Sequence, residues 1–214
     1  MELVTSTRRQ DGRDAIAIVA HPDDEILWCG GLILQKSDWS WSILSLSRAG
    51  DEDRCPKFRR VCEHLGAQGW ISDLDDSNPL RQLQPVRDIG RRISQYAGGR
   101  DWDLCITHGA NGEYGHQRHR EVHAEVMRLA GGGGLSCREL WTFACVCDAR
   151  TGQCTARSDS DIRVALTDGQ LAEKKRIVHE MYGYGPDSFE VKACVSPEGF
   201  HRQVIRRRED EKGV

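Results

Sequence analysis

The chain has 214 residues, of which 38% are hydrophobic and 29% are charged, and its 30 basic residues nearly balance 33 acidic ones, for a net charge of −3. This length predicts one domain over residues 1–214 with a sizeable hydrophobic core. The balanced charge gives no reason to expect binding to nucleic acid or to an anionic membrane surface. No stretch approaches the roughly 18 consecutive apolar residues of a membrane span, so we predict no integral-membrane segment.

Short apolar runs alternate along the chain with helical patterns. The predicted strands are 15–20, 39–47, 70–74, 103–108, 140–147 and 162–166, and the predicted helices are about 23–35, 58–65, 86–96, 116–130 and 168–182. This alternation predicts an α/β fold, namely a Rossmann-like three-layer sandwich with a mainly parallel central sheet. Ligands of such sheets bind at the carboxyl ends of the strands, where polar loops 47–56 and 110–115 also lie.

The nine cysteines are odd in number, form no Cys-x-x-Cys pair and mostly lie within apolar runs. Residues 1–9 lack the apolar core of a secretory signal peptide. We therefore predict reduced cysteines in the core of a cytoplasmic protein, without a disulfide framework.

The sequence Ala-His-Pro-Asp-Asp-Glu occupies residues 20–25, directly after the first apolar run. His21 and the carboxylates of Asp23, Asp24 and Glu25 are crowded within five positions, which costs free energy unless a cation or a partner offsets the like charges. A divalent metal ion is the simplest such cation. The alternative is an ordinary helix start with Pro22 at the first helical position, but helix capping needs only one or two acids.

A second group of metal-binding side chains follows the fourth predicted strand. His116, His119 and His123 are spaced three and four residues apart, which places them on one face of a helix. A surface stripe is the alternative interpretation. His116 and His119 lie in the first turn, nearest the strand ends, whereas His123 lies one turn further on and is expected to be a supporting residue. His108, at the end of the fourth strand, is expected either to line the site or to support it.

These two motifs together resemble the LmbE-like (PIG-L) family of zinc-dependent N-acetylglucosaminyl deacetylases. The first motif is highly specific. The second is looser, because residues 116–119 read His-Gln-Arg-His where the family often shows His-Pro-Asp-His. The resemblance covers residues 15–127 well and the rest of the chain loosely.

The resemblance implies a role for several residues of this chain. His21, Asp24 and His119 would bind the metal, Asp23 would be the general base, and His116 would face the substrate carbonyl. Arg54 matches best the arginine with which family members hold the substrate, with Arg48, Arg59 and Arg60 as competitors. Tyr182 and Tyr184 are candidates for a tyrosine that contributes in some members.

The chemistry of these residues supports the same assignment. Two histidines and one carboxylate leave a metal position open for water, as in hydrolytic zinc sites. Zinc lowers the pKa of such a water toward about 7, a neighbouring carboxylate can take its proton, and a protonated His116 would stabilise the oxyanion. Glu25 is expected to support a ligand by a hydrogen bond.

We therefore predict a deacetylase of a small-molecule N-acetylated amino sugar or its conjugate. The expected cofactor is Zn²⁺, with Fe²⁺ as an alternative. The pocket is expected to be open or to be completed by a second subunit in a homo-oligomer.

Three other functions are weighed against it: an amidase of a sugar–thiol conjugate, a non-haem iron enzyme and a nucleotide-binding α/β module. An iron oxygenase would need no base such as Asp23, and the Gly-x-Gly-x-x-Gly fingerprint of nucleotide-binding folds is absent after the first strand.

Overall fold

A computed structural model describes residues 12–78, 87–148 and 150–205. The expectations for residues 1–9, and for the start of the predicted helix at residue 86, lie outside these ranges. Among the described residues, no helix combines the length and the apolar character that crossing a bilayer requires.

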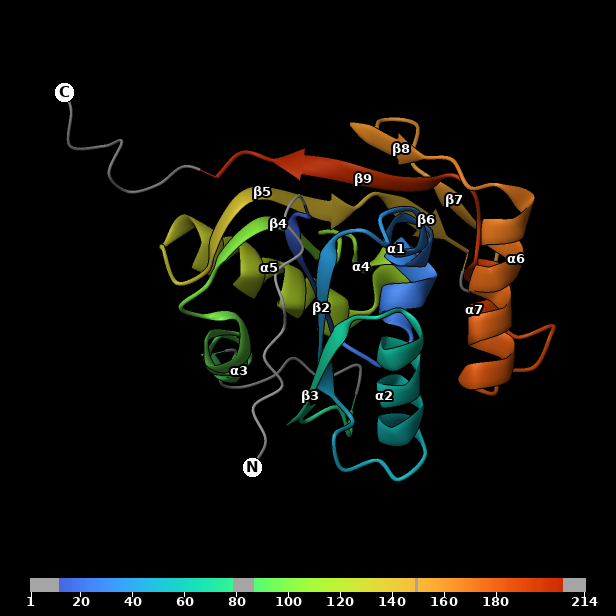
Figure 1. Cartoon of the computed structure of the whole chain (residues 1–214), viewed down its shortest axis with the longest axis horizontal. Coiled ribbons are helices and arrows are strands. Elements are labelled where there is room, and N and C mark those ends of the chain that lie inside the picture. The colour runs from blue at the N-terminus through green and yellow to red at the C-terminus, as the bar shows by residue number, and fades with distance from the viewer. Residues whose placement is uncertain (1–11, 79–86, 149, 206–214) are drawn as a thin grey trace.

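The centre of the molecule is a seven-stranded sheet in the order β3-β2-β1-β4-β5-β9-β8 (Figure 1). Neighbours from β3 to β5 pair in parallel, whereas β9 pairs antiparallel with both β5 and β8. The strands are β1 (Asp14–Val19), β2 (Ser40–Ser47), β3 (Gln68–Leu74), β4 (Asp101–Thr107), β5 (Ser136–Phe143), β8 (Ile162–Val164) and β9 (Glu198–Gln203). A separate two-stranded sheet pairs β6 (Cys145–Cys147) with β7 (Cys154–Ala156).

Helices cover both faces of the central sheet. Successive side chains of a strand point to opposite faces, so a strand that is apolar throughout has to be covered on both. Ala15, Ala17 and Val19 of β1 pack on one side, and Ile16 and Ile18 pack on the other. The first side is covered by α1 (Asp24–Gln35), α2 (Arg54–His64), η1 (Ile177–Met181) and α7 (Phe189–Ala193), with α6 (Asp168–Arg176) leading into η1; the second side is covered by α3 (Arg87–Ala97) and α5 (Gln117–Gly131). The predicted three-layer α/β architecture is confirmed.

Several element boundaries differ from the sequence-based expectation. Helix α2 begins at Arg54, so this residue lies in the first helical turn and not in the preceding loop. The predicted strand 140–147 is two strands in different sheets, β5 and β6. The predicted helix 168–182 changes at Ile177 from an α-helix to a π-helix. Strands β7 and β9 and helix α7 were not predicted.

The prediction that all cysteines are reduced is wrong for one pair. Cys147 and Cys154 form a disulfide that links the two strands of the β6–β7 sheet. The two residues are directly paired neighbours across the antiparallel ladder, which brings their side chains together. The other seven cysteines are free and buried, as predicted.

A buried ion pair attaches the C-terminal part of the chain to α1. Nζ of Lys174, on α6, donates to Oε1 of Glu198, at the start of β9, at 2.7 Å. The same carboxylate accepts the backbone N–H groups of Gly31 and Leu32 in α1, at 2.7 and 2.9 Å. Because α1 starts with the Asp23-Asp24 motif, Glu198 and Lys174 help to fix the helix that carries the candidate site.

Candidate active site

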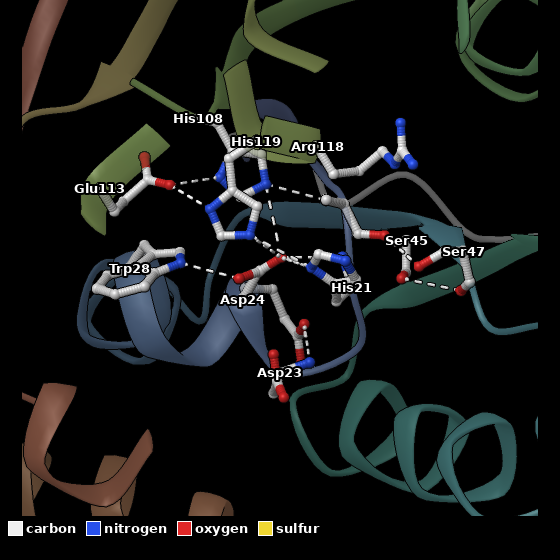
Figure 2. Close-up of polar contacts among 12 residues, drawn as sticks. His21, Asp23, Asp24, Trp28, Ser45, Ser47, His108, Glu113, Arg118 and His119 are labelled. Atoms are coloured by element: carbon white, nitrogen blue, oxygen red, sulfur yellow. Dashed lines mark hydrogen bonds and ion pairs between the residues drawn. The ribbon is translucent and has the colours of Figure 1, made fainter. Parts of the chain in front are cut away.

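The Asp-Asp motif occupies a strained turn between β1 and α1. Asp23 has φ of 113° and ψ of −33°, a conformation that L-residues rarely adopt. Its carbonyl oxygen accepts the N–H groups of Ile26 and Leu27, both at 2.9 Å, so the residue starts the helix in spite of its unusual φ. This turn brings Asp23 and Asp24 to the carboxyl end of β1, where His21 also lies (Figure 2).

Three side-chain atoms from two distant segments form a compact triangle. His21 Nδ1 lies 3.2 Å from Asp24 Oδ2 and 3.3 Å from His119 Nε2, and His119 Nε2 lies 3.4 Å from Asp24 Oδ2 (Figure 2). Ligand atoms held about 2.0–2.1 Å from a tetrahedral zinc ion are themselves about 3.3–3.4 Å apart. The donor set is therefore of the right type and spacing for a divalent metal ion.

Each corner of this triangle is oriented by a further hydrogen bond. His21 Nε2 lies 3.1 Å from Asp76 Oδ2, His119 Nδ1 contacts Glu113 Oε2, and the Trp28 indole N–H donates to Asp24 Oδ1 at 3.0 Å. Since a carboxylate only accepts, the histidine nitrogens that face Asp76 and Glu113 carry the protons. His119 Nε2 is then left unprotonated, as metal ligation requires. His21 Nδ1 also faces the Asp24 carboxylate; burial lowers the pKa of His21, but Asp24 and Asp76 outweigh burial and raise it to about 10, so a metal ion that binds Nδ1 would displace a proton.

His108 offers another donor close to Asp24 and His119, and these three residues also have the spacing of a metal site. However, His108 Nε2 accepts the backbone N–H of Ala20 at 2.9 Å, and His108 Nδ1 lies 3.0 Å from Glu113 Oε2. Both nitrogens are thus engaged. The sequence left open whether His108 lines the site or supports it, and these contacts fit the supporting role. His21 is therefore the better partner of Asp24 and His119 in a metal site.

Glu113 lies at the centre of this support. It has φ of 57°, lies in the short helix α4 (Gly112–Gly115) and is 1% exposed. Its other oxygen, Oε1, accepts the Gly109 N–H at 2.8 Å. Burial opposes its charge, but His108 and His119 outweigh this effect and lower the pKa of Glu113 to about 2. It is therefore an anion that fixes two histidine rings.

Asp23 faces the pocket beside the triangle. Its Oδ2 accepts a hydrogen bond from the Tyr184 hydroxyl and lies 3.6 Å from Arg54 Nη1. Burial and the neighbouring charge of Asp24 raise the pKa of Asp23 above its usual range. Asp23 is thus a carboxylate with raised basicity next to three convergent donor atoms.

Glu25 supports Asp23 through the backbone, which differs from the expected bond to a metal ligand. The fully buried Glu25 accepts the Asp23 N–H on Oε2 at 3.0 Å and the Tyr182 hydroxyl on Oε1 at 2.5 Å. Tyr182 and Tyr184 flank Gly183, which has φ of 83°, directly after the π-helix. This turn points one tyrosine hydroxyl at Glu25 and the other at Asp23.

Arg54 and His116 line the pocket with unsatisfied polar atoms. Within the described part of the chain, Arg54 Nη1 and His116 Nδ1 are the buried side-chain nitrogen or oxygen atoms without a hydrogen-bond partner. The Arg54 guanidinium lies over the Tyr184 ring at 4.4 Å. Of its competitors, Arg48 also lines the pocket, whereas Arg59 and Arg60 lie on the exposed face of α2. Buried atoms of this kind are suited to bind a polar substrate.

His116 is the N-cap residue of α5, and its ring centroid lies 4.5 Å from that of His119. Burial, followed by the neighbouring His119 and His21, lowers the pKa of His116 to about 4. The structure therefore favours a neutral imidazole at neutral pH, where we expected a protonated one. His123 contacts the His108 carbonyl oxygen at 2.9 Å through Nδ1, which places it in a supporting position.

The pocket over these residues has a volume of about 300 Å³. Its walls combine acids, arginines and aromatic rings: His21, Pro22, Asp23, Asp24, Leu27, Arg48, Arg54, Asp76, Tyr114, His116, Tyr184, Phe189 and Glu190. Asp76 was not singled out from the sequence, although it follows β3 and so lies at the same sheet edge as the motifs. Phe189 and Glu190 had no sequence signal, because α7 was not predicted.

In open α/β sheets, small molecules bind at the carboxyl ends of the strands, and a pocket with convergent polar groups lies at that edge here. A model of the PIG-L family, described as GlcNAc-PI de-N-acetylase, matches residues 16–130, which is more than half of the chain. The chain therefore belongs to the PIG-L family, and the resemblance to LmbE-like proteins is confirmed. All three triangle donors, Asp23 and His116 lie within the matched range.

Among curated proteins, the chain is similar to the uncharacterized protein L374 of Acanthamoeba polyphaga mimivirus. The two are 23% identical in an alignment of 123 positions, which covers 51% of this chain and 54% of that protein. The aligned part thus spans about half the length of this relative.

Three solved structures share the fold. The conserved protein TT1542 from Thermus thermophilus has a TM-score of 0.64 at 14% identity, covering 90% of this chain and 96% of that one. GalB, the 4-carboxy-2-hydroxymuconate hydratase from Pseudomonas putida KT2440, has a TM-score of 0.61 at 14% identity, with the same coverage of 90% and 96%. The A40926 pseudoaglycone deacetylase Dbv21 has a TM-score of 0.57 at 15% identity, covering 85% and 89%. At these identities the likeness shows the fold.

Proposed function

We propose that this protein is a metal-dependent hydrolase that removes the acetyl group from an N-acetylated amino sugar, of the N-acetylglucosamine type, or from its conjugate. One observation carries the proposal: a triangle of donor atoms from His21, Asp24 and His119, with sides of 3.2–3.4 Å, stands beside the buried carboxylate of Asp23. The membership of the PIG-L family supports the same reaction class.

His21, Asp24 and His119 would hold the metal, for which zinc is our first choice and ferrous iron the alternative. Bound there, a divalent ion would supply Lewis acidity, which lowers the pKa of a coordinated water and polarises an amide carbonyl. Two ring nitrogens and one carboxylate oxygen would fit this task once the metal has displaced the proton of His21 Nδ1, because the other polar atoms of these side chains already contact Asp76, Glu113 and Trp28.

The remaining steps belong to side chains of the pocket. Asp23, with its raised pKa, would accept a proton from the attacking water and return it to the leaving amine. His116 would donate a hydrogen bond to the carbonyl oxygen as negative charge develops there, and its unpartnered Nδ1 is free to take part. Arg54 would bind a polar group of the substrate near Asp23, since its Nη1 also lacks a hydrogen-bond partner.

The Asp23→Asn variant tests the proposal. It keeps the shape of the side chain and removes its basicity, so the variant should still bind zinc while acetate release falls by about 10²–10⁴-fold. Asp38→Asn is the matched control, because Asp38 is exposed near the other end of α1. A panel of N-acetyl sugars is assayed for both acetate and free amine, since the same fold also occurs in a hydratase. Undiminished acetate release by the Asp23→Asn variant would refute the mechanism.

A further inference from the structure

Arg118 is a buried cation next to the metal triangle. It lies in the first turn of α5, immediately before His119, and only 1% of the residue is exposed (Figure 2). Burying a guanidinium costs several kcal/mol unless it is paired and hydrogen-bonded. Its Nη1 contacts the carboxylate of Glu121 one turn further along the helix, and its Nε lies 3.4 Å from Asp76 Oδ1.

Asp76 connects this cation to a triangle residue. One of its oxygens, Oδ1, faces Arg118, and the other, Oδ2, accepts a hydrogen bond from His21 Nε2 at 3.1 Å. The opposite nitrogen of the same ring, His21 Nδ1, is the donor atom that points at Asp24 and His119. Asp76 therefore orients the His21 ring by accepting the hydrogen bond from Nε2.

Asp76 lies in the segment after β3, of which residues 75–78 are described, and these residues belong to no helix or strand. Because no regular backbone hydrogen bonding fixes residues 75–78, the position of the Asp76 carboxylate depends on its side-chain contacts. Within the described residues, its ion-pair partners besides His21 are Arg118 and, at 3.6 Å, Arg48 Nη2. The side chain of Arg48 is 47% exposed, whereas that of Arg118 is 2% exposed. Because water screens an exposed charge and a buried one is screened far less, Arg118 is the stronger of the two constraints on Asp76.

We propose that Arg118 is a positioning residue that sets the metal affinity of His21 by holding the Asp76 carboxylate in place. The proposal rests on the metal centre of the proposed function. It goes beyond that function by assigning a role in metal binding to a buried arginine that does not itself contact the metal and lies on the same helix as His119. Arg118 touches no substrate atom in this scheme and acts only through Asp76.

The test measures zinc affinity of the full-length apoprotein by competition with a chromophoric chelator, so it requires no substrate. Arg118→Met removes the charge and keeps most of the side-chain volume, and we expect zinc affinity to fall by about 10- to 100-fold, as is typical when an outer partner of a metal ligand is lost. Arg128→Met is the matched control on the same helix, because the Arg128 side chain is 61% exposed and pairs with Glu125 and not with any residue of the triangle. This control should change zinc affinity by less than about twofold.

The Asp76→Asn variant and the double variant show whether Arg118 acts through Asp76. If it does, Asp76→Asn weakens zinc binding on its own, and adding Arg118→Met to it costs little more. Losses that add in full would overturn the proposal, as would wild-type affinity in Arg118→Met. If Arg118→Met fails to fold, Asp76→Asn decides, and wild-type zinc affinity in that variant overturns the proposal. Absence of zinc binding by the wild-type protein would instead refute the metal centre itself.

Discussion

The buried ion pair between Lys174 and Glu198 gives a prediction that can be worked out from its contacts. The two side chains are 0% and 2% exposed, and Lys174 Nζ lies 2.7 Å from Glu198 Oε1. Removing one member of a buried pair typically costs about 3–5 kcal/mol, since the other charge stays buried without compensation. In Lys174→Met the carboxylate would still accept the N–H groups of Gly31 and Leu32, so we expect the lower end, about 3 kcal/mol.

For a chain of this size, about 3 kcal/mol corresponds to a fall in Tm of roughly 6–12 °C. Glu198→Gln should cost more, about 5 kcal/mol, because it leaves a buried ammonium and weakens the acceptor for the two backbone N–H groups. The assay is thermal and urea unfolding followed by circular dichroism. Lys175→Met, on the exposed side of α6, is the control and should stay within about 0.5 kcal/mol of wild type.

The double variant Lys174→Met/Glu198→Gln should be more stable than the sum of the single losses predicts, because neither residue then leaves a lone buried charge. The reasoning would be refuted if Lys174→Met unfolded with the free energy of the wild type. It would also be refuted if the two losses added in full, since the residues would then not act as a pair.

Three further predictions concern other contacts. Tyr182→Phe removes the hydroxyl group that donates to Glu25 at 2.5 Å, so we expect the free energy of unfolding to fall by about 1.5–3 kcal/mol. Because Glu25 also accepts the backbone N–H of Asp23, kcat should fall at unchanged KM, and an unchanged kcat in folded protein would contradict this role. Removing zinc with a chelator should lower Tm by roughly 8–16 °C relative to protein in free zinc at a thousandfold excess over its Kd. Equal Tm values for the two forms would count against the metal centre. Alkylation of the denatured, unreduced protein should modify seven cysteines, as Cys147 and Cys154 form a disulfide, and labelling of all nine would show that the pair is reduced.

The sequence predicted the parts of the site that depend on local pattern. The apolar run before His21 and the histidine spacing from His116 to His119 each mark the end of a parallel strand or the start of the following helix. Since the carboxyl ends of parallel strands meet at one edge, the two motifs had to converge. The structure brings His21, Asp23, Asp24, His116 and His119 to that edge, within one pocket or its wall.

What the sequence did not predict depends on contacts between distant residues. Strand β9 contains Gly199, His201 and Arg202 and lacks a regular apolar alternation, and it forms because β5 offers it an unpaired edge. The positive φ of Asp23 carries no sequence signal, because glycine is the residue that usually marks such a conformation. Arg118 has no sequence signal that separates it from a surface position of a helix, whereas in the structure it is buried in contact with Glu121 and with Asp76, which follows β3.

The turn around Gly183 has a consequence for how this protein can diverge from its relatives. The triangle residues, Asp23 and His116 come from the first 130 residues, whereas Tyr184, Phe189 and Glu190, which complete the pocket wall, come from the last third of the chain. Phe189 and Glu190 can thus change between family members without altering the residues that we propose for the chemistry. A chimera that imports residues 185–193 from another family member would change the wall at Phe189 and Glu190 and keep the hydroxyl groups of Tyr182 and Tyr184, which contact Glu25 and Asp23.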